Sequence, residues 1–163
     1  KDFFVTNGLA SEDKIGIAGT SMGGITTLGA LTQYPWIKAA ASLMGAPVTK
    51  KLAEHFIHQV TKNGVSLPIS DDVLEKALNE LNPFDITLQL EKLNHRPLLL
   101  WHGKKDETVP FSFTYDFYTS IRPLYKNVPE RLQFVADERS GHKVSIAGVH
   151  HFVRWFEQYL LSE

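Results

Sequence analysis

One stretch decides how this chain folds: Ile15-Gly16-Ile17-Ala18-Gly19-Thr20-Ser21-Met22-Gly23-Gly24. It begins as a short apolar run with β-branched residues, typical of a strand, and it ends in the pattern Gly-x-Ser-x-Gly. An amphipathic stretch that favours a helix, Ile25 to Tyr34, follows at once. A strand, a sharp turn and a helix around such a serine are typical of a nucleophile elbow. We therefore predict that Ser21 adopts a strained backbone conformation that holds its hydroxyl clear of the chain.

The glycines and the start of the helix add two expectations. Gly19 and Gly23 are expected to be needed sterically, because a side chain at either position would collide where the strand and the helix nearly touch. The helix starts at the serine, so the backbone N–H of Met22 is predicted to point to where a substrate oxygen gains negative charge. The rival interpretation is a phosphate-binding loop. It is disfavoured because Ile25-Thr26 stands where that loop needs Lys and Ser or Thr.

Composition narrows the class of protein. With 163 residues, 43% of them hydrophobic, the chain can bury the core of one globular domain. The formal net charge of −1 gives no basic field, so no nucleic-acid partner is predicted. No apolar run approaches the ~20 residues of a membrane span, so no membrane partner is expected. The absence of cysteine excludes disulfides and thiol chemistry and favours a cytoplasmic location.

The first residues resemble the end of a helix. Lys1-Asp2-Phe3-Phe4-Val5 fits its last turns, and Asn7-Gly8 is a usual C-terminal stop. Since the sequence opens without an initiator Met or a targeting segment, we expect that the beginning of the fold is missing from it. The sequence therefore gives no information on a signal peptide.

Three more apolar runs predict strands after the elbow, at residues 39–44, 97–103 and 131–135. Helices are expected at 111–121 and at the C-terminus. The C-terminal helix has apolar residues on one face: Ile146, Val149, Val153, Phe156 and Leu160. Strands that alternate with helices indicate parallel βαβ units, so the predicted fold is α/β, with a parallel sheet of about four strands.

Residues 48–95 differ in character from the rest and predict a small helical cap inserted into the core, which comprises residues 1–47 and 96–163. The first helix of this insertion carries an apolar stripe at helical spacing. Ser70 is expected to be the N-cap of the second helix, because two aspartates follow it in the first turn.

The chemistry of a nucleophilic serine points to two further residues. A serine hydroxyl needs a base, and the base needs a partner that fixes its tautomer. In open α/β sheets such groups lie on loops at the carboxyl ends of strands. Three loops offer them here: Ser21 after the first strand, Asp106 after the third and His142 after the fourth. This is the chain order of an α/β-hydrolase.

Several residues remain as alternatives. Asp137 and Glu138, close to His142 in sequence, are the spare acids. His102 is expected to shape the loop that carries Asp106 rather than to react.

The other histidines and the aromatic residues are assigned to packing or solvent. His55 and His58 can share a helix face, but no third ligand accompanies them, so no metal site is predicted. His150 and His151 are expected to pack or to face solvent. Four aromatic residues are expected in the core, with one or two lining an acyl pocket: Phe111, Phe113, Phe117 and Tyr118.

The chain resembles the C-terminal two-thirds of an α/β-hydrolase, and it is similar to bacterial esterases of the dienelactone-hydrolase and prolyl-oligopeptidase-like branch. Three motifs carry this resemblance in the expected order: Gly-Thr-Ser-Met-Gly-Gly at 19–24, His-Gly-Lys-Lys-Asp-Glu-Thr-Val-Pro at 102–110 and Ser-Gly-His at 140–142. The resemblance covers essentially the whole chain.

This resemblance implies a three-layer fold that hydrolyses small-molecule carboxylic esters and needs no cofactor or metal. It implies Ser21 as the nucleophile, His142 as the general base and Asp106 as the acid that orients the base. The backbone N–H of Met22 would be one oxyanion donor.

The sequence also departs from the family. The first strands have no counterpart, and neither has the loop that supplies the second oxyanion donor, whose loss typically costs ~10²–10³ in rate. The elbow strand is then an unpaired edge, so we expect a homo-oligomer through this exposed edge of the sheet. Two other functions stay open. One is a non-catalytic or weakly active fragment that associates through this edge, and the other is an acyltransferase or peptidase with the same triad.

Overall fold

Parallel strands form one sheet in the computed structural model, which describes residues 1–161. The sheet has four strands in the order β1-β2-β3-β4, and each strand pairs in parallel with the next one along the chain. The strands are β1 (Gly16–Thr20), β2 (Ala39–Leu43), β3 (Leu98–Gly103) and β4 (Leu132–Asp137). The predicted α/β fold with a parallel sheet is confirmed.

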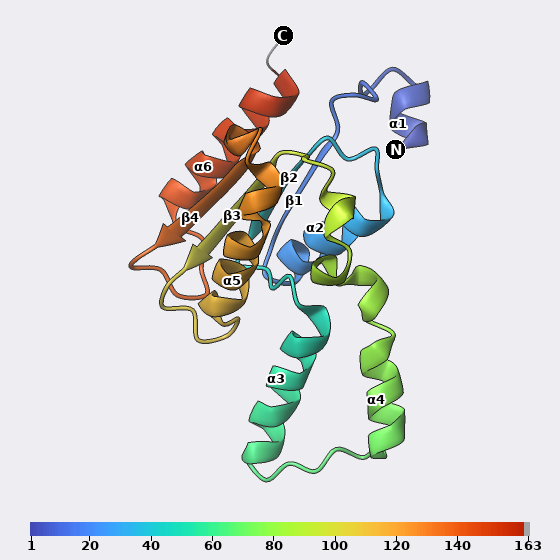
Figure 1. Ribbon diagram of the computed structural model, residues 1–163, viewed down its shortest axis with the longest axis vertical. Helices are drawn as coiled ribbons and strands as arrows, with labels where there is room; N and C mark the ends of the chain where they lie inside the picture. The colour runs from blue at the N-terminus through green and yellow to red at the C-terminus, as the bar shows by residue number, and fades with distance from the viewer. Residues whose placement is uncertain (162–163) are drawn as a thin grey trace.

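Helices cover both faces of the sheet (Figure 1). On one face, α2 (Met22–Gln33) and α5 (Phe111–Ile121) pack with Leu98 and Leu100 of β3. On the other face, Trp155 of α6 (Ile146–Phe156) packs with Leu99, the residue of β3 between Leu98 and Leu100. Alternate residues of a strand point to opposite faces, so the run Leu98-Leu99-Leu100 of β3 packs into a core on each face of the sheet. The layers are therefore helix, sheet and helix.

The central strands are buried and the outer ones are not. Every residue of β2 and β3 is buried, whereas β1 and β4 are partly exposed along their length. The mostly apolar composition of the central strands follows from this burial, because a parallel strand covered on both faces has no solvent side.

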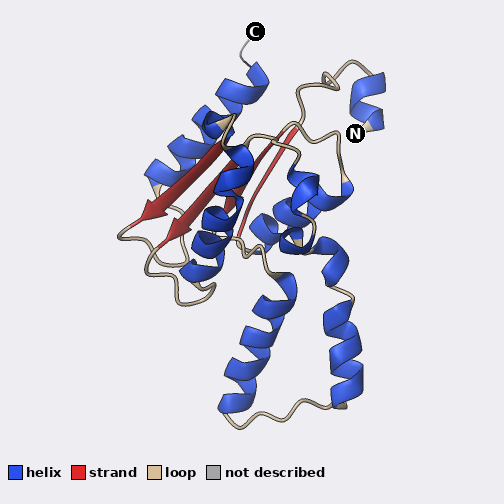
Figure 2. Cartoon of the chain, viewed as in Figure 1, coloured by secondary structure: helices blue, strands red, loops and turns tan. Residues whose placement is uncertain are grey.

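Two helices between β2 and β3 extend away from the sheet (Figures 1 and 2). They are α3 (Thr49–Lys62) and α4 (Asp71–Asn79). The buried carboxylate of Asp85 holds the base of this excursion, since it accepts hydrogen bonds from the backbone N–H of Thr49 (3.0 Å) and of Thr87 (2.9 Å). The division into core and cap stays a prediction.

The remaining helices are short. A five-residue helix, α1 (Asp2–Thr6), opens the chain, as predicted for Lys1–Val5. The others are η1 (Asn82–Phe84), η2 (Ile86–Leu88), η3 (Leu90–Leu93), η4 (Arg122–Tyr125), η5 (Pro129–Arg131) and the π-helical η6 (Glu157–Leu161). Among the helices described over residues 1–161, none has the length and apolarity needed to cross a membrane.

The Ser70 prediction is right in position and wrong in mechanism. Ser70 precedes α4 with extended backbone, but its hydroxyl accepts no capping hydrogen bond from that helix as described. The hydroxyl instead binds the side chain of Asp72 and favours its charged form, which lowers the pKa of that carboxyl. The first turn is thus stabilised by acidic residues rather than by the serine.

The apolar face predicted for the C-terminal helix splits in two. A Cβ placed on Gly16 of β1 would lie 2.6 Å from Phe156 and 2.7 Å from Leu160, so these two pack at the edge strand. Val149 and Val153 are each 42% exposed and Ile146 is 79% exposed. The sheet instead contacts the neighbouring face of the helix, through Phe152 and Trp155. The exposed residues Ile146, Val149 and Val153 are called the α6 stripe below.

We expect the 163-residue chain to self-associate through the β1 edge and the α6 stripe, because unpaired edges and apolar patches favour association. Val149→Glu combined with Val153→Glu should lower the sedimentation coefficient at equal concentration. Leu124→Glu is the matched control, because Leu124 is also 42% exposed but lies in η4. Equal sedimentation of the wild type and the double variant would contradict this expectation.

Candidate active site

Ser21 lies in the turn between β1 and α2 with φ 54° and ψ −118°. A positive φ is uncommon for a residue other than glycine and costs on the order of 1–3 kcal/mol. Neighbouring backbone holds it there: its N–H donates to the carbonyl of Leu43 (2.9 Å), and its carbonyl accepts from Ile25 (3.0 Å). Met22 is the first residue of α2, where backbone N–H groups have no partner within the helix. The predicted strained turn is therefore present.

The expectation that both glycines are sterically needed holds for Gly19 and is wrong for Gly23. A Cβ on Gly19 would lie 2.2 Å from the carbonyl oxygen of Gly23, where β1 meets the first turn of α2. A Cβ on Gly23 would meet no heavy atom within 4 Å in the part of the chain that the structure describes. The close approach is between the strand residue and the helix backbone, so only the strand position must lack a side chain.

Asp106 follows β3 in the loop before α5, which we call the acid loop (residues 104–110). Its side chain is fully buried. Oδ1 accepts hydrogen bonds from the backbone N–H of Thr108 and of Val109, both at 2.9 Å. Oδ2 lies 2.8 Å from Nδ1 of His142 and 3.2 Å from Nε2 of His102.

His142 connects the other two predicted residues. Its Nδ1 lies 2.8 Å from Oδ2 of Asp106, and its Nε2 lies 2.8 Å from Oγ of Ser21. An ionised carboxylate only accepts, so in the neutral ring Nδ1 carries the proton and Nε2 accepts from the serine hydroxyl. The structure therefore brings Ser21, His142 and Asp106 into one hydrogen-bonded chain at the carboxyl ends of the strands.

The spare acids make other contacts. Oδ1 of Asp137 accepts from the backbone N–H of Arg139 and Ser140, both at 3.0 Å, and Oδ2 accepts from the hydroxyl of Ser145 (2.8 Å). Glu138 pairs with Lys104 at 2.6 Å. Asp137 thus shapes the loop that carries His142, while the contacts described for His142 run to other residues.

The two loops are joined where they cross. Lys105 N–H donates to the carbonyl of Ser140 (3.0 Å), and Lys104 N–H donates to that of Asp137 (2.8 Å). A Cβ on Gly103 would lie 2.3 Å from the Ser140 carbonyl, so this approach requires glycine. The distance between the carboxylate and the imidazole is therefore set by the backbone.

Burial and hydrogen bonding act in opposite directions on the titrating groups. Burial alone would raise the pKa of Asp106, but the N–H donors of Val109, His142 and Thr108 outweigh it and hold that pKa below its usual range. Burial lowers the pKa of His102 and is its largest influence, although Val109 and Asp106 oppose it. The site therefore holds one ionised carboxylate and one buried neutral imidazole.

The remaining predicted residues lie elsewhere. His55 packs edge-on against Phe56 and Phe113, and Phe117 is in the core as predicted. Phe111 packs edge-on against His102. Among residues 1–161 there is no group of three or more His, Cys, Asp or Glu side chains arranged to hold a metal ion. His58, His150 and His151 make no contact with the Ser21 chain of hydrogen bonds as described.

Sequence reasoning missed the contact of Thr114 with His102, whose Nδ1 lies 2.8 Å from Oγ1 of Thr114. Thr114 is on α5, a helix that reads as aromatic-rich packing. One feature of the sequence could have indicated this contact: Thr114 is polar, whereas the residues at helical spacing from it are apolar.

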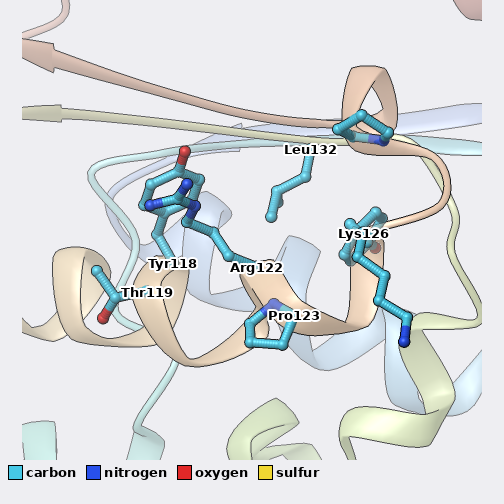
Figure 3. Close-up of a pocket in the computed structure, with 8 residues that line it drawn as sticks. Tyr118, Thr119, Arg122, Pro123, Lys126 and Leu132 are labelled. Atoms are coloured by element: carbon cyan, nitrogen blue, oxygen red, sulfur yellow. The ribbon is translucent and has the colours of Figure 1, made fainter.

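A hollow of about 520 Å³ lies outside the Ser21–His142–Asp106 site. Figure 3 shows the side chains that line it. It is lined by side chains of α5, η4 and the start of β4, among them Tyr118, Arg122 and Leu132. Leu132 is the first residue of β4, whereas Ser21 follows the last residue of β1. Because the strands are parallel, the hollow lies at the opposite end of the sheet and does not belong to the candidate site.

Known proteins match this chain over most of its length. The model of the prolyl oligopeptidase family matches residues 1–163. The chain is 47% identical over 160 residues to the Bacillus subtilis (strain 168) protein named "Putative esterase YitV", which covers 98% of this chain and 63% of YitV. It is 31% identical over 99 residues to "Esterase YjfP" of Escherichia coli (strain K12), which covers 61% of this chain and 39% of YjfP. The chain thus spans less than two thirds of either relative.

Solved structures share the fold. An acylaminoacyl peptidase in complex with Z-Gly-Gly-Phe-chloromethyl ketone has a TM-score of 0.75 at 23% identity, over 99% of this chain and 26% of that one. The uncomplexed Pyrococcus horikoshii acylaminoacyl peptidase has a TM-score of 0.67 at 26% identity, over 98% and 26%. Acetyl xylan esterase 1 from Thermoanaerobacterium sp. JW/SL YS485 has a TM-score of 0.68 at 16% identity, over 94% and 47%.

The lowered pKa of His102 predicts an acid-sensitive stability. An unfolded histidine titrates near pH 6.5. Below that pH the unfolded chain binds a proton that the folded chain does not, so this stabilising contribution is present above about pH 6.5 and is lost as pH falls through it. The slope for one group is at most about 1.4 kcal/mol per pH unit.

The measurement is urea unfolding of the wild type and His102→Gln at pH 7.5 and at pH 5.5. The wild type should lose more stability between these two pH values than the variant does. Equal losses would show that His102 is not held neutral by the fold.

Proposed function

The chain belongs to the prolyl oligopeptidase family, and we propose that it hydrolyses carboxylic esters of small molecules through an acyl-enzyme on Ser21. One observation carries the proposal: two hydrogen bonds of 2.8 Å link Ser21 Oγ to His142 and His142 to the buried Asp106. Each atom in this series of hydrogen bonds has the donor or acceptor character that nucleophilic attack by a serine requires.

In the proposed acylation, Nε2 of His142 takes the hydroxyl proton while Oγ of Ser21 bonds to the ester carbonyl carbon. The bond from that carbon to the alkoxy oxygen then breaks, and His142 gives its proton to the departing alkoxide. In deacylation His142 takes a proton from water, and the hydroxide displaces Ser21 to release the carboxylic acid. The proton returns to Oγ, so the enzyme is unchanged.

The proposed role of Asp106 is to hold the imidazole in the Nδ1–H tautomer and to stabilise the imidazolium that forms during each half-reaction. Its lowered pKa supports this role, because a carboxyl that stays ionised remains an acceptor. The N–H of Met22 is the proposed donor to the oxyanion, since it lies at the start of α2 next to the nucleophile.

Residues 48–95 are proposed to act as a cap beside this site. The segment leaves the core directly after β2, whose last residue, Leu43, accepts the backbone hydrogen bond of Ser21 (2.9 Å). Its helices α3 and α4 expose apolar side chains, among them Phe56 (41%) and Val73 (50%), which suit contact with the apolar part of an ester.

A peptidase is the second candidate. The uncomplexed Pyrococcus horikoshii acylaminoacyl peptidase is 26% identical over 98% of this chain. The acyl-enzyme is the same in both reactions, and only the leaving group differs, an amine instead of an alkoxide. The two bacterial relatives, YitV and YjfP, favour ester hydrolysis over peptide hydrolysis, because one is named a putative esterase and the other an esterase. Parallel assays with an aryl ester and the matching aryl amide separate the two.

A fluorophosphonate probe should label Ser21, because the probe reacts with a serine activated by a neighbouring imidazole. Ser21→Ala should abolish the labelling. Ser11→Ala is the matched control, since Ser11 is exposed on a loop and should leave labelling unchanged. Labelling that persists in Ser21→Ala would disprove the assignment of the nucleophile.

Asp106→Asn should lower kcat for an aryl ester by up to ~10⁴, because an amide no longer holds the required imidazole tautomer. Asp137→Asn should lower it far less, since Asp137 acts on the loop backbone and on Ser145. Circular dichroism checks that both variants fold. An equal loss in the two folded variants would mean that the orienting acid is misassigned.

A further inference from the structure

A second imidazole contacts the carboxylate of the proposed triad. His102 lies in β3, four residues before Asp106, and is fully buried. Its Nε2 lies 3.2 Å from Oδ2 of Asp106 and 3.0 Å from the carbonyl oxygen of Val109. Its Nδ1 lies 2.8 Å from Oγ1 of Thr114. Both ring nitrogens of His102 are therefore occupied by protein groups.

The neighbours of the ring decide where its proton is. A carbonyl oxygen and an ionised carboxylate only accept hydrogen bonds, so Nε2 must carry a proton to satisfy them. The Thr114 hydroxyl has one proton, and its oxygen lies close to Nδ1 and 3.2 Å from the carbonyl of Gly45. Burial lowers the pKa of His102, so the ring is neutral and its Nδ1 accepts that proton. The ring therefore donates through Nε2 alone.

Burial favours this neutral state. The ring has no exposed surface, and the aromatic ring of Phe111 packs edge-on against it at 5.7 Å. The titratable groups that act on it are Asp106 and His142, and Asp106 already receives hydrogen bonds from His142 and from two backbone N–H groups. A second full charge beside this carboxylate would have to be buried without solvent, which is costly.

Four donors hold the carboxylate of Asp106, two at each oxygen. The backbone N–H groups of Thr108 and Val109 hold Oδ1. Oδ2 is shared between His142 and His102, at 2.8 Å and 3.2 Å. Because His142 lies on another loop and must change its charge during the proposed reaction, His102 is the donor that stays on Oδ2 throughout.

The same ring also connects the acid loop to the nucleophile side of the site. Oγ1 of Thr114 lies 3.2 Å from the carbonyl oxygen of Gly45, and a Cβ placed on Gly24 of α2 would lie 2.9 Å from Cα of Gly45. Gly24 is three residues from Ser21 on the first turn of α2. A short chain of buried contacts thus runs from Asp106 through His102 and Thr114 to the backbone beside the proposed nucleophile.

We propose that His102 is a positioning residue for the Ser21–His142–Asp106 triad: a neutral, buried donor that holds Oδ2 of Asp106 toward His142. The proposal rests on the proposed function for its catalytic consequence. Its structural content, a donor from Nε2 to the acid, is independent of turnover.

Two substitutions of His102 separate the two ring nitrogens. In His102→Gln the side-chain amide nitrogen falls near the position of Nε2 and keeps a donor for Asp106. In His102→Asn the amide falls near Nδ1, so contact with Thr114 is kept and the donor to Asp106 is lost. We expect His102→Asn to lower kcat by on the order of 10²-fold with little change in KM, as for a displaced catalytic group. His102→Gln should lose much less.

A proton signal gives a readout that a merely structural role would not move. The Nδ1–H of His142, hydrogen-bonded to Oδ2 of Asp106, is expected as a low-field proton resonance in ¹⁵N-histidine-labelled protein. Losing one donor to Oδ2 strengthens the remaining bond, so the resonance should move in His102→Asn and stay near its wild-type position in His102→Gln. An unmoved resonance and unchanged kcat in His102→Asn would overturn the proposal.

Thr114 provides the test if His102→Asn does not fold. Thr114→Val removes the donor to Nδ1, and Thr114→Ser keeps it, so the first should move the His142 resonance and the second should not. Equal spectra for the two would overturn the proposal. If the wild-type protein hydrolyses no ester while the His102→Asn or Thr114→Val resonance still moves, the proposed function has failed and the positioning role has not.

Discussion

The buried carboxylate of Asp106 is the interaction on which the rest of the site depends. An ionised group without solvent is costly unless it is fully hydrogen-bonded, and this one accepts from two backbone N–H groups and lies within reach of two imidazoles. Each donor comes from a segment that must be in place: the acid loop, the end of β3 and the loop after β4. The charge therefore selects one arrangement of these segments, in which the loop after β4 meets two segments that precede it by more than 20 residues.

The parallel sheet lowers the free-energy cost of that arrangement. Parallel strands end at one edge, so the elbow, the acid loop and the histidine loop begin side by side. The buried central strands β2 and β3 give this edge a rigid base. Close backbone approach at Gly103 brings the acid loop to the loop that carries His142, and close approach at Gly19 brings β1 against the first turn of α2. The strained backbone of Ser21 is kept in place by the hydrogen bonds of its own N–H and carbonyl to neighbouring backbone, not by its side chain.

Much of the fold was predictable from the sequence, and the failures have physical causes. Apolar runs identified all four strands, and the signal is most continuous in β2 and β3 because these two are buried on both faces. Helical periodicity identified α6 but not which face meets the sheet, since two overlapping apolar faces exist and packing chooses between them. The role of Gly23 and the contact of His102 with Thr114 depend on the direction of single side chains across elements, which spacing along the chain does not encode.

The central claim is that Ser21 is acylated during ester turnover through His142 and Asp106. The most direct measurement is rapid-quench mass spectrometry of the protein mixed with an aryl ester, followed by digestion. The account predicts a peptide containing Ser21 that carries the acyl group within the first turnover, and no such peptide in His142→Ala. Ester turnover without acylation of Ser21, or with acylation at another residue, would contradict it.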